Sequence, residues 1–249
     1  MTMKMENILV SQAIPRDLAP YEELTKKYGV KFSFRPFFLI KPLTSREFRA
    51  QRVDILAYTA IVFSARHTID AFFEICDELR IKIPDTMKYF CTTEAVAVYL
   101  QKHIVFRKRK IFFGTGTPDS VLALVTARHK DEKFLITTTE SSKNEQMANA
   151  FEKAGLKYDT AAFVKPVSQD LHDVDLSAFD MLVFYNPFDL RSLKENFPDF
   201  KQGNLKFLAY GKHIAAALEE EGIEVAIHAP TPEAPSVAAA VEQYLQKNG

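Results

Sequence analysis

Short apolar runs alternate with longer amphipathic stretches along almost the whole chain. The apolar runs are typical of buried strands, and the longer stretches repeat apolar residues at helical spacing, as Ile69, Phe72, Phe73 and Cys76 do. We predict strands at 8–10, 30–34, 57–63, 88–90, 110–113, 134–136, 156–164, 181–185, 207–210 and 225–227. We predict helices at 21–28, 45–49, 68–80, 94–102, 120–128, 144–154, 189–196, 214–221 and 237–246, with an apolar connector at 37–43. This alternation predicts an α/β protein with parallel sheets.

The two halves of the chain repeat one another. Leu9 and Gly29 are 20 residues apart, and so are Leu135 and Gly155, and each pair brackets a strand, a loop and a helix. Two further strands match at offsets of 121 and 120 residues: 61–64 with 182–185, and 89–91 with 209–211. Such a repeat predicts two similar α/β domains that face each other across a cleft.

Composition excludes several classes of protein. The chain has 249 residues, of which 47% are hydrophobic, so it can bury a core. Its 32 basic and 32 acidic residues leave no net charge to attract nucleic acid or an anionic membrane. We see no apolar run of about 20 residues and no signal peptide, and Cys76 and Cys91 form no CxxC pair. We therefore expect a cytoplasmic protein.

The familiar motifs of metal and nucleotide chemistry are missing. No pair among the histidines has the i, i+3 or i+4 spacing of helical metal ligands: His67, His103, His129, His172, His213 and His228. The run 114–117 lacks the ending of a Walker A loop, and no GxSxG or GxGxxG is present. We expect no metal and no cofactor.

What remains is a set of short polar loops between strands and helices. They carry hydroxyl, amide or glycine residues, which allow backbone N–H groups at a helix N-terminus to bind a carboxylate or phosphate. They are Ser64-Ala65-Arg66, Thr92-Thr93, 114–117 with Thr115, 137–139 with Thr138, Asn186 and Gly211-Lys212-His213. The simpler interpretation of any one loop is N-capping of its own helix. Six such loops in two facing domains make anion binding an equally good one. The basic run 107–110 is better explained as a solvated strand entrance.

Four runs, in order, resemble the uroporphyrinogen-III synthase family over essentially the whole chain. The run 61–73 (IVFSARHTIDAFF) stands where the family has "vFTSrnAvdaFf", and 182–187 (LVFYNP) where it has "vFtSps". The run 209–218 (AYGKHIAAAL) stands for "aiGptTaxaL", and 229–237 (APTPEAPSV) for the "a..pt.e.l" tail. The resemblance implies two flavodoxin-like domains with parallel sheets, joined by a two-stranded linker. It places domain 1 at 1–38 plus 167–249 and domain 2 at 40–164, with Pro36, Pro42 and Pro166 at the crossovers.

The resemblance also implies a reaction. The family cyclises the linear tetrapyrrole hydroxymethylbilane to uroporphyrinogen III, with loss of water and inversion of ring D. Positioning and electrostatic support would supply most of the catalysis. It implies a cofactor-independent lyase of porphyrin (haem) biosynthesis, acting as a monomer on this small molecule, with no nucleic acid or membrane partner.

Several family positions differ in this chain. The second linker reads Ala162-Phe163-Val164-Lys165 where the family often has a tyrosine, and Ile214, Ala65 and Asn186 replace hydroxyl residues. The catalytic candidates are Tyr185, Lys165 and His213. The substrate-binding candidates are Ser64, Ala65, Arg66, Thr92, Thr93, Thr115, Thr138, Lys165, Asn186, Gly211, Lys212 and His213.

Two alternatives stay open. One is a catalytically weakened relative that binds a tetrapyrrole or another polycarboxylate without turnover. The other is an unrelated two-lobed sensor of a small anionic metabolite.

Overall fold

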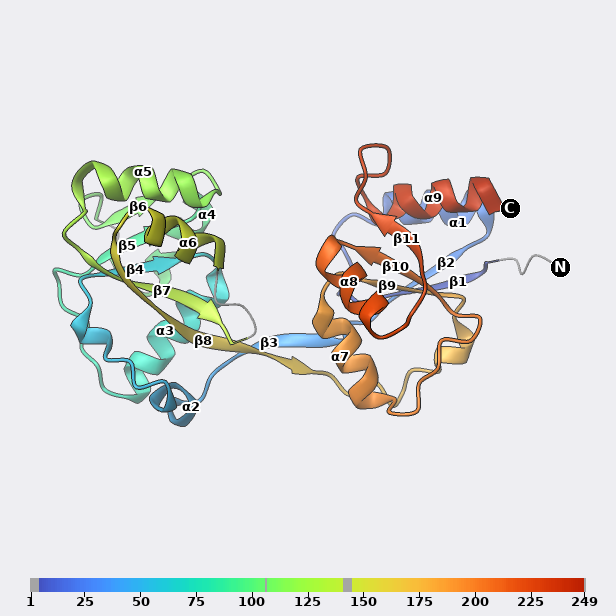
Figure 1. Cartoon of the computed structure of the whole chain (residues 1–249), viewed down its shortest axis with the longest axis horizontal. Helices are drawn as coiled ribbons and strands as arrows, with labels where there is room; N and C mark the ends of the chain where they lie inside the picture. The colour runs from blue at the N-terminus through green and yellow to red at the C-terminus, as the bar shows by residue number, and fades with distance from the viewer. Residues whose placement is uncertain (1–4, 106, 141–144, 249) are drawn as a thin grey trace. The chain divides into compact units, whose positions relative to one another are not determined.

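The computed structural model describes residues 5–105, 107–140 and 145–248 (Figure 1). The chain folds into two compact units, each built around its own sheet. Unit 1 comprises 1–39 and 167–249, and unit 2 comprises 40–166. The predicted α/β class, with two flavodoxin-like domains, is confirmed.

Unit 1 contains a five-stranded sheet in the order β11-β10-β9-β1-β2, and its strand pairs are parallel. With β1 as the first strand, this is the 2-1-3-4-5 order of flavodoxin-like folds, whose switch point lies between β1 and β9. The strands are β1 (Asn7–Val10), β2 (Lys31–Phe34), β9 (Met181–Phe184), β10 (Lys206–Tyr210) and β11 (Val225–Ala229). The helices are α1 (Ala19–Tyr28), α7 (Pro187–Asn196), α8 (Lys212–Glu220) and α9 (Val237–Asn248), with a 3₁₀ turn at Leu176–Ala178.

Both faces of the unit 1 sheet are apolar, because successive residues of a strand point to opposite sides. Ile8 and Val10 pack with the residues of α1 and α9, whereas Leu9 packs with those of α7 and α8. Figure 1 shows these two helix pairs on opposite faces of the sheet. This burial explains why the strands read as continuous apolar runs.

Unit 2 contains a six-stranded sheet in the order β3-β8-β7-β4-β5-β6. If β7 is counted as the first strand, β8-β7-β4-β5-β6 repeats the 2-1-3-4-5 order of unit 1, which accounts for the internal sequence repeat. The strands are β3 (Phe38–Pro42), β4 (Ala60–Phe63), β5 (Lys88–Cys91), β6 (Ile111–Phe113), β7 (Lys133–Thr139) and β8 (Lys157–Ser168). The helices are α2 (Ser45–Ala50), α3 (Arg66–Glu78), α4 (Glu94–Tyr99), α5 (Pro118–Arg128) and α6 (Glu145–Lys153), with 3₁₀ turns at Ile55–Ala57 and Leu100–Lys102.

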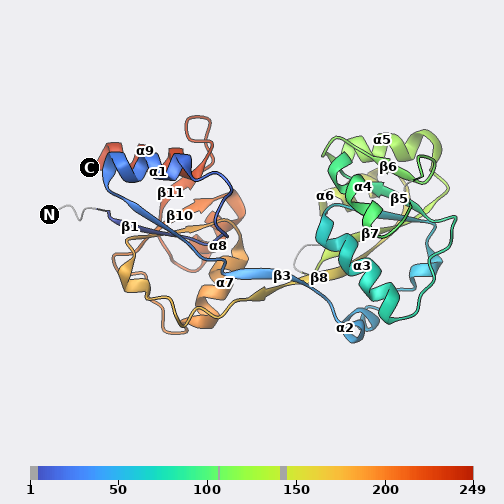
Figure 2. The same ribbon diagram turned by 180° about the vertical axis from the view of Figure 1, so that it is seen from behind.

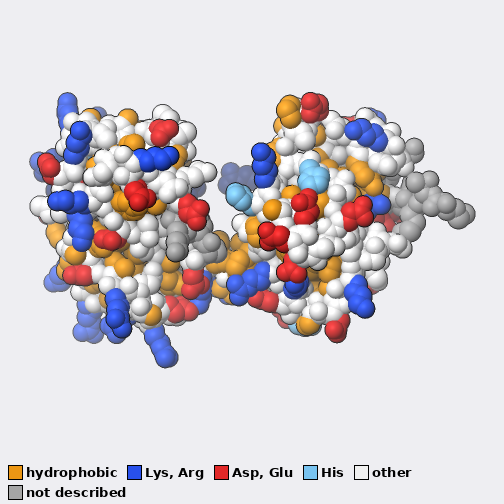
Figure 3. All heavy atoms as spheres, in the orientation of Figure 1, with side chains coloured by type: hydrophobic (Ala, Val, Ile, Leu, Met, Phe, Trp, Pro, Cys, Tyr) orange, Lys and Arg blue, Asp and Glu red, His pale blue; other side chains and the backbone are white. Residues whose placement is uncertain are grey.

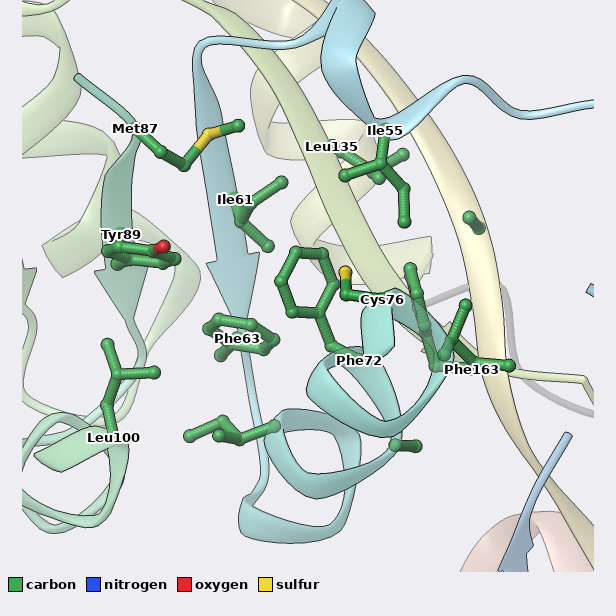
Figure 4. Packing of buried hydrophobic residues seen from close by; sticks show 14 of the residues in the cluster. Ile55, Ile61, Phe63, Phe72, Cys76, Met87, Tyr89, Leu100, Leu135 and Phe163 are labelled. Atoms are coloured by element: carbon green, nitrogen blue, oxygen red, sulfur yellow. The ribbon is translucent and has the colours of Figure 1, made fainter. Parts of the chain in front are cut away.

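Aromatic residues fill the core of unit 2 beneath α3. Phe72 is fully buried and packs edge-to-face against Phe63, with ring centroids 5.4 Å apart (Figure 4). Phe163 of β8 also packs against Phe72, with ring centroids 5.4 Å apart. The α5 and α6 residues pack in a separate cluster on the face of the sheet opposite to α3 and α4, which are labelled in the rear view of the molecule in Figure 2.

The structure corrects three local predictions. The loop predicted at 137–139 is wrong, because β7 continues to Thr139 and pairs with β8 along this stretch. The connector at 37–43 contains strand β3, and the strand predicted from 57 begins at Ala60 after a 3₁₀ turn. The predicted start of a helix at Asn144 lies outside the described residues. Within the described ranges, every helix is too short or too polar to span a bilayer.

Candidate functional site

Most of the predicted binding residues lie at the carboxyl edge of one of the two sheets. In unit 1, Tyr185 and Asn186 follow β9, and Gly211 follows β10. In unit 2, the loops 64–66, 92–93 and 114–117 follow β4, β5 and β6. Open α/β sheets bind ligands at this edge, so each unit presents its polar loops on the appropriate side.

The helices that begin at these edges differ in whether their N-termini are already occupied. Thr93 caps α4 by accepting a hydrogen bond from the Val96 amide at 3.3 Å, and Thr117 caps α5 through the Ser120 amide at 3.3 Å. Asn186 caps α7 by accepting from the Phe188 amide at 2.9 Å. At these three helices the capping interpretation of the polar loops holds.

The N-terminus of α3 is open. Its N-cap residue, Ala65, has the extended backbone of an N-cap but no side-chain oxygen, and no described side chain caps the helix. The first helical residue, Arg66, is exposed, and its guanidinium lies 5.5 Å from the centre of the Tyr99 ring. Arg66, Tyr99 and Lys102 border a recess of about 350 Å³. An uncapped helix start whose first residue is an exposed arginine is suited to a carboxylate.

The N-terminus of α8 is open in the same way. Its N-cap is Gly211, and no described side chain caps the helix. Gly211 has φ 131°, ψ 150°, a conformation that L-residues with a side chain rarely adopt. Lys212 and His213 follow it and are exposed, whereas Ile214 is fully buried in the core of unit 1. The replacement of the family's threonine by Ile214 therefore adds packing, and the backbone N–H groups remain as donors.

Four of the predicted binding residues are engaged elsewhere. The Thr92 hydroxyl donates to the Ser64 carbonyl at 3.2 Å, and the Thr115 amide donates to the Ser120 hydroxyl at 2.9 Å. Thr138 lies within β7 and is only 6% exposed. Lys165 lies within β8 and forms an ion pair with the carboxylate of Glu47. This contact lowers the pKa of Glu47 to about 2, with further help from Thr44.

Tyr185 belongs to a group of tyrosines at the carboxyl edge of unit 1. Its ring centroid lies 5.2 Å from that of Tyr210, which ends β10 and donates its hydroxyl to the Pro235 carbonyl at 2.7 Å. Burial raises the pKa of Tyr185, and Tyr21 and Tyr210 raise it further. The phenol is therefore a weaker acid than an ordinary tyrosine, and at neutral pH it can donate a hydrogen bond.

The two units carry opposite net charges. Unit 2 has 20 Lys and Arg against 15 Asp and Glu, a net charge of +5, whereas unit 1 has 12 against 17, a net charge of −5. Blue basic side chains are prominent around unit 2 in Figure 3. Although the chain has no net charge, unit 2 alone is positively charged and favours binding of polyanions.

One cavity of unit 1 lies away from the predicted binding residues. A cavity of about 670 Å³ lies at the opposite, amino-terminal edge of the unit 1 sheet, bordered by Phe179, Asp180 and Lys206. None of the predicted binding residues borders it. Among the described residues, no three His, Cys, Asp or Glu side chains gather so as to hold a metal ion.

A family model described as "Uroporphyrinogen-III synthase HemD" matches residues 19–239. The chain belongs to the uroporphyrinogen-III synthase family. This family comprises hydro-lyases of tetrapyrrole biosynthesis that act on a linear tetrapyrrole. The resemblance predicted from the sequence runs is therefore confirmed.

Solved structures of uroporphyrinogen-III synthases share the fold. A structure from Helicobacter pylori has 16% sequence identity and a TM-score of 0.53, and the match covers 98% of this chain and 100% of that one. A mutant from Thermus thermophilus has 17% identity and a TM-score of 0.50, with 97% and 99% covered. No curated protein sequence matches the chain.

Sequence reasoning missed the most unusual polar residue at this edge, Asp189 of this family member. Its side chain is 1% exposed and accepts hydrogen bonds from the Tyr185 amide at 2.9 Å and the Asn186 amide at 3.0 Å. The available signal was the spacing of Asn186 and Asp189, which is that of a capping box. The spacing gives no sign that the carboxyl group is buried.

Proposed function

We propose that the chain is a uroporphyrinogen-III synthase, which cyclises hydroxymethylbilane to uroporphyrinogen III with loss of water and inversion of ring D. The observation that carries the proposal is that each unit contains a helix that has no side-chain cap and begins with an exposed cation, α3 with Arg66 and α8 with Lys212. The substrate is a polycarboxylate, and such helix ends bind carboxylates through backbone N–H groups. The family match over 19–239 supports the choice of substrate.

The chemistry needs positioned donors more than it needs a nucleophile. Loss of the substrate hydroxyl produces an azafulvenium-type cation, which the substituted carbon of ring D then attacks. The half-buried Tyr185 is our candidate for donating a hydrogen bond to the departing hydroxyl, because it follows β9 at the carboxyl edge of the unit 1 sheet. Its ring is held beside Tyr210, so it is pre-oriented before substrate arrives. His213 is a second candidate donor, because it is exposed in the first turn of α8.

Lys165 becomes a weaker catalytic candidate than its sequence position indicates. Its ammonium is already paired with Glu47, so it would have to leave that carboxylate to reach a substrate group. Lys212 forms no ion pair within the part of the chain that the structure describes, and it remains the better anion-binding residue.

The proposal is tested by supplying the purified protein with freshly generated hydroxymethylbilane and separating the uroporphyrinogen isomers. We expect uroporphyrinogen III in excess of the isomer I that forms by spontaneous closure. Isomer I alone, at the spontaneous rate, would refute the proposed activity.

A second candidate function is tetrapyrrole binding without turnover. The linker strand has Phe163 and Lys165 where the family often has a tyrosine. Phe163 is fully buried and Lys165 is paired with Glu47, so neither side chain is free to replace the tyrosine as a donor, which favours this second candidate. Saturable binding of uroporphyrin I, an octacarboxylate porphyrin, together with spontaneous product only, would select this candidate. Failure to bind uroporphyrin I would exclude it.

A further inference from the structure

Unit 1 has two neighbouring helix N-termini, of which one is open to a carboxylate and the other is occupied by one. Strands β9 and β10 are adjacent in the sheet, and helices α7 and α8, which follow them, pack against each other. The N-terminus of α8 is open and is followed by Lys212, as described above. The N-terminus of α7 is closed by a carboxylate from within the same helix, Asp189.

Asp189 closes this end completely. One oxygen, Oδ2, accepts from the backbone amides of Tyr185 and Asn186, and the Asn186 side chain takes the Phe188 amide. The other oxygen, Oδ1, is buried and has no hydrogen-bond partner among the described residues. The backbone amides that could bind an incoming anion at the N-terminus of α7 are therefore already hydrogen-bonded, and the ionised Asp189 carboxylate adds a negative charge beside them.

The surroundings of Asp189 contain no cation to neutralise it. The groups that face it are the Ser11 hydroxyl at the end of β1, the Tyr185 phenol after β9 and the amides already named. The Ser11 hydroxyl is itself only 5% exposed, and it is the one side-chain hydroxyl that lowers the pKa of Asp189. No Lys or Arg of the described chain forms an ion pair with Asp189. Ser11 and Asp189 lie at the switch point between β1 and β9, where flavodoxin-like sheets bind ligands.

We propose that Asp189 is a specificity-determining positioning residue: its buried carboxylate excludes substrate carboxylates from the β9–α7 loop and directs them to the open N-terminus of α8. This inference rests on the proposed polycarboxylate substrate. It leaves the β9–α7 loop, with Tyr185, for a part of the substrate that carries no carboxylate. The electron-poor carbon formed when the hydroxyl departs is such a part, and nearby negative charge stabilises it.

The charge of Asp189 also makes the effect dependent on pH. Burial raises the pKa of Asp189 to about 6, against the lowering effect of the two amides and the Ser11 hydroxyl. Above that pH the residue is ionised and repels anions, and below it the repulsion disappears. For a substrate carboxylate near the β9–α7 loop, roughly 10 Å from Asp189, and an effective dielectric constant of ~20, the repulsion weakens binding about tenfold.

The test compares the affinity of uroporphyrin I for the wild type, Asp189→Asn and a matched control between pH 5.5 and 8. Asparagine keeps an oxygen that can accept from the amides but removes the charge. We expect Asp189→Asn to bind about tenfold more tightly at pH 8, with the advantage shrinking as the pH falls through about 6. The control, Ser192→Ala, removes a fully buried hydroxyl of the same helix that bonds to the Phe37 carbonyl, and it should bind like the wild type.

A second variant separates a charge effect from a structural one. Ser11→Ala removes a group that lowers the pKa of Asp189, so the pKa of Asp189 should rise in this variant. Asp189 then ionises, and weakens uroporphyrin I binding, only at a higher pH than in the wild type. Equal affinity of Asp189→Asn and wild type at every pH, including no binding by either, overturns the proposal. In turnover, Asp189→Asn should lower KM and kcat together, because substrate carboxylates are then no longer repelled from the β9–α7 loop. A wild type that makes isomer I alone would overturn the proposed function, while the binding comparison would still decide the role of Asp189.

Discussion

Closing the open N-terminus of α3 should stabilise the protein and weaken substrate binding at the same time. Ala65 already has the extended backbone of an N-cap residue, with φ −151° and ψ 156°, so Ala65→Asp needs no backbone change. Its carboxylate would accept hydrogen bonds from the free amides at the start of α3, as Thr93 does for α4. Replacing alanine by a good cap stabilises a helix by about 1 kcal/mol.

The same substitution removes the donors that we assign to a substrate carboxylate. Losing one charge-assisted hydrogen bond costs about 1.5–3 kcal/mol of binding, or roughly 10- to 150-fold in affinity. Opposite signs for stability and binding are the signature of a helix end left open for a ligand. A residue that only supports the fold would change both in the same direction.

The assay pairs a denaturant titration with the dissociation constant of uroporphyrin I. The matched control is Thr117→Asp, which adds the same charge to α5, a helix of the same unit that is already capped. We expect a higher denaturation midpoint and at least tenfold weaker binding for Ala65→Asp, with little change in either quantity for the control. Unchanged affinity in Ala65→Asp, or an equal loss in Thr117→Asp, would refute the assignment of the α3 end.

Three further predictions follow from the contacts of individual residues. Lys212→Ala should weaken uroporphyrin I binding by about 1.5–3 kcal/mol in isothermal titration. Lys165→Ala should weaken binding clearly less, because Lys165 is paired with Glu47. Equal losses of binding free energy in the two variants would contradict this difference. Phe72→Ala should lower the free energy of unfolding by about 3–5 kcal/mol, because the ring is fully buried against Phe63 and Phe163. A loss below about 1 kcal/mol in a denaturant titration would contradict this packing. The raised pKa of Asp189, about 6 against 3.8, favours the folded state most below pH 4, and this stabilisation, about 3 kcal/mol, is lost as the pH rises through 6. Asp189→Asn should therefore lack this part of the pH dependence of stability, and an unchanged stability profile would contradict the burial of an ionisable carboxyl group.

The strands and helices were largely readable from the sequence, because strands buried on both faces leave continuous apolar runs. Two of the three local failures have clear physical causes. Thr137 to Thr139 read as a polar loop, yet the fully buried Thr137 donates its hydroxyl to the Val62 carbonyl at 2.9 Å, which allows the polar run to continue as a strand. The linker strand β3 lies at the edge of its sheet, next to β8, and its apolar run carried no alternation to identify it.

The candidate site was predictable in outline only. The sequence located the loops after the strands, but it could not say which hydroxyls cap their own helices, since that depends on rotamers and distances. Thr93 and Asn186 are caps, whereas Ala65 and Gly211, which lack hydroxyls, begin the open helices. Asp189 was overlooked because an aspartate in the first turn of a helix is ordinary, and only its burial makes it unusual.

The most direct test of the central claim is the initial rate of uroporphyrinogen III formation by the wild type and by the double variant Ala65→Asp/Lys212→Ala. Both proteins would receive hydroxymethylbilane generated in the same vessel, and their folds would be compared by circular dichroism. We expect isomer III from the wild type, and a folded double variant whose product approaches the spontaneous isomer I. Isomer I alone from the wild type, or wild-type rates from the double variant, would contradict it.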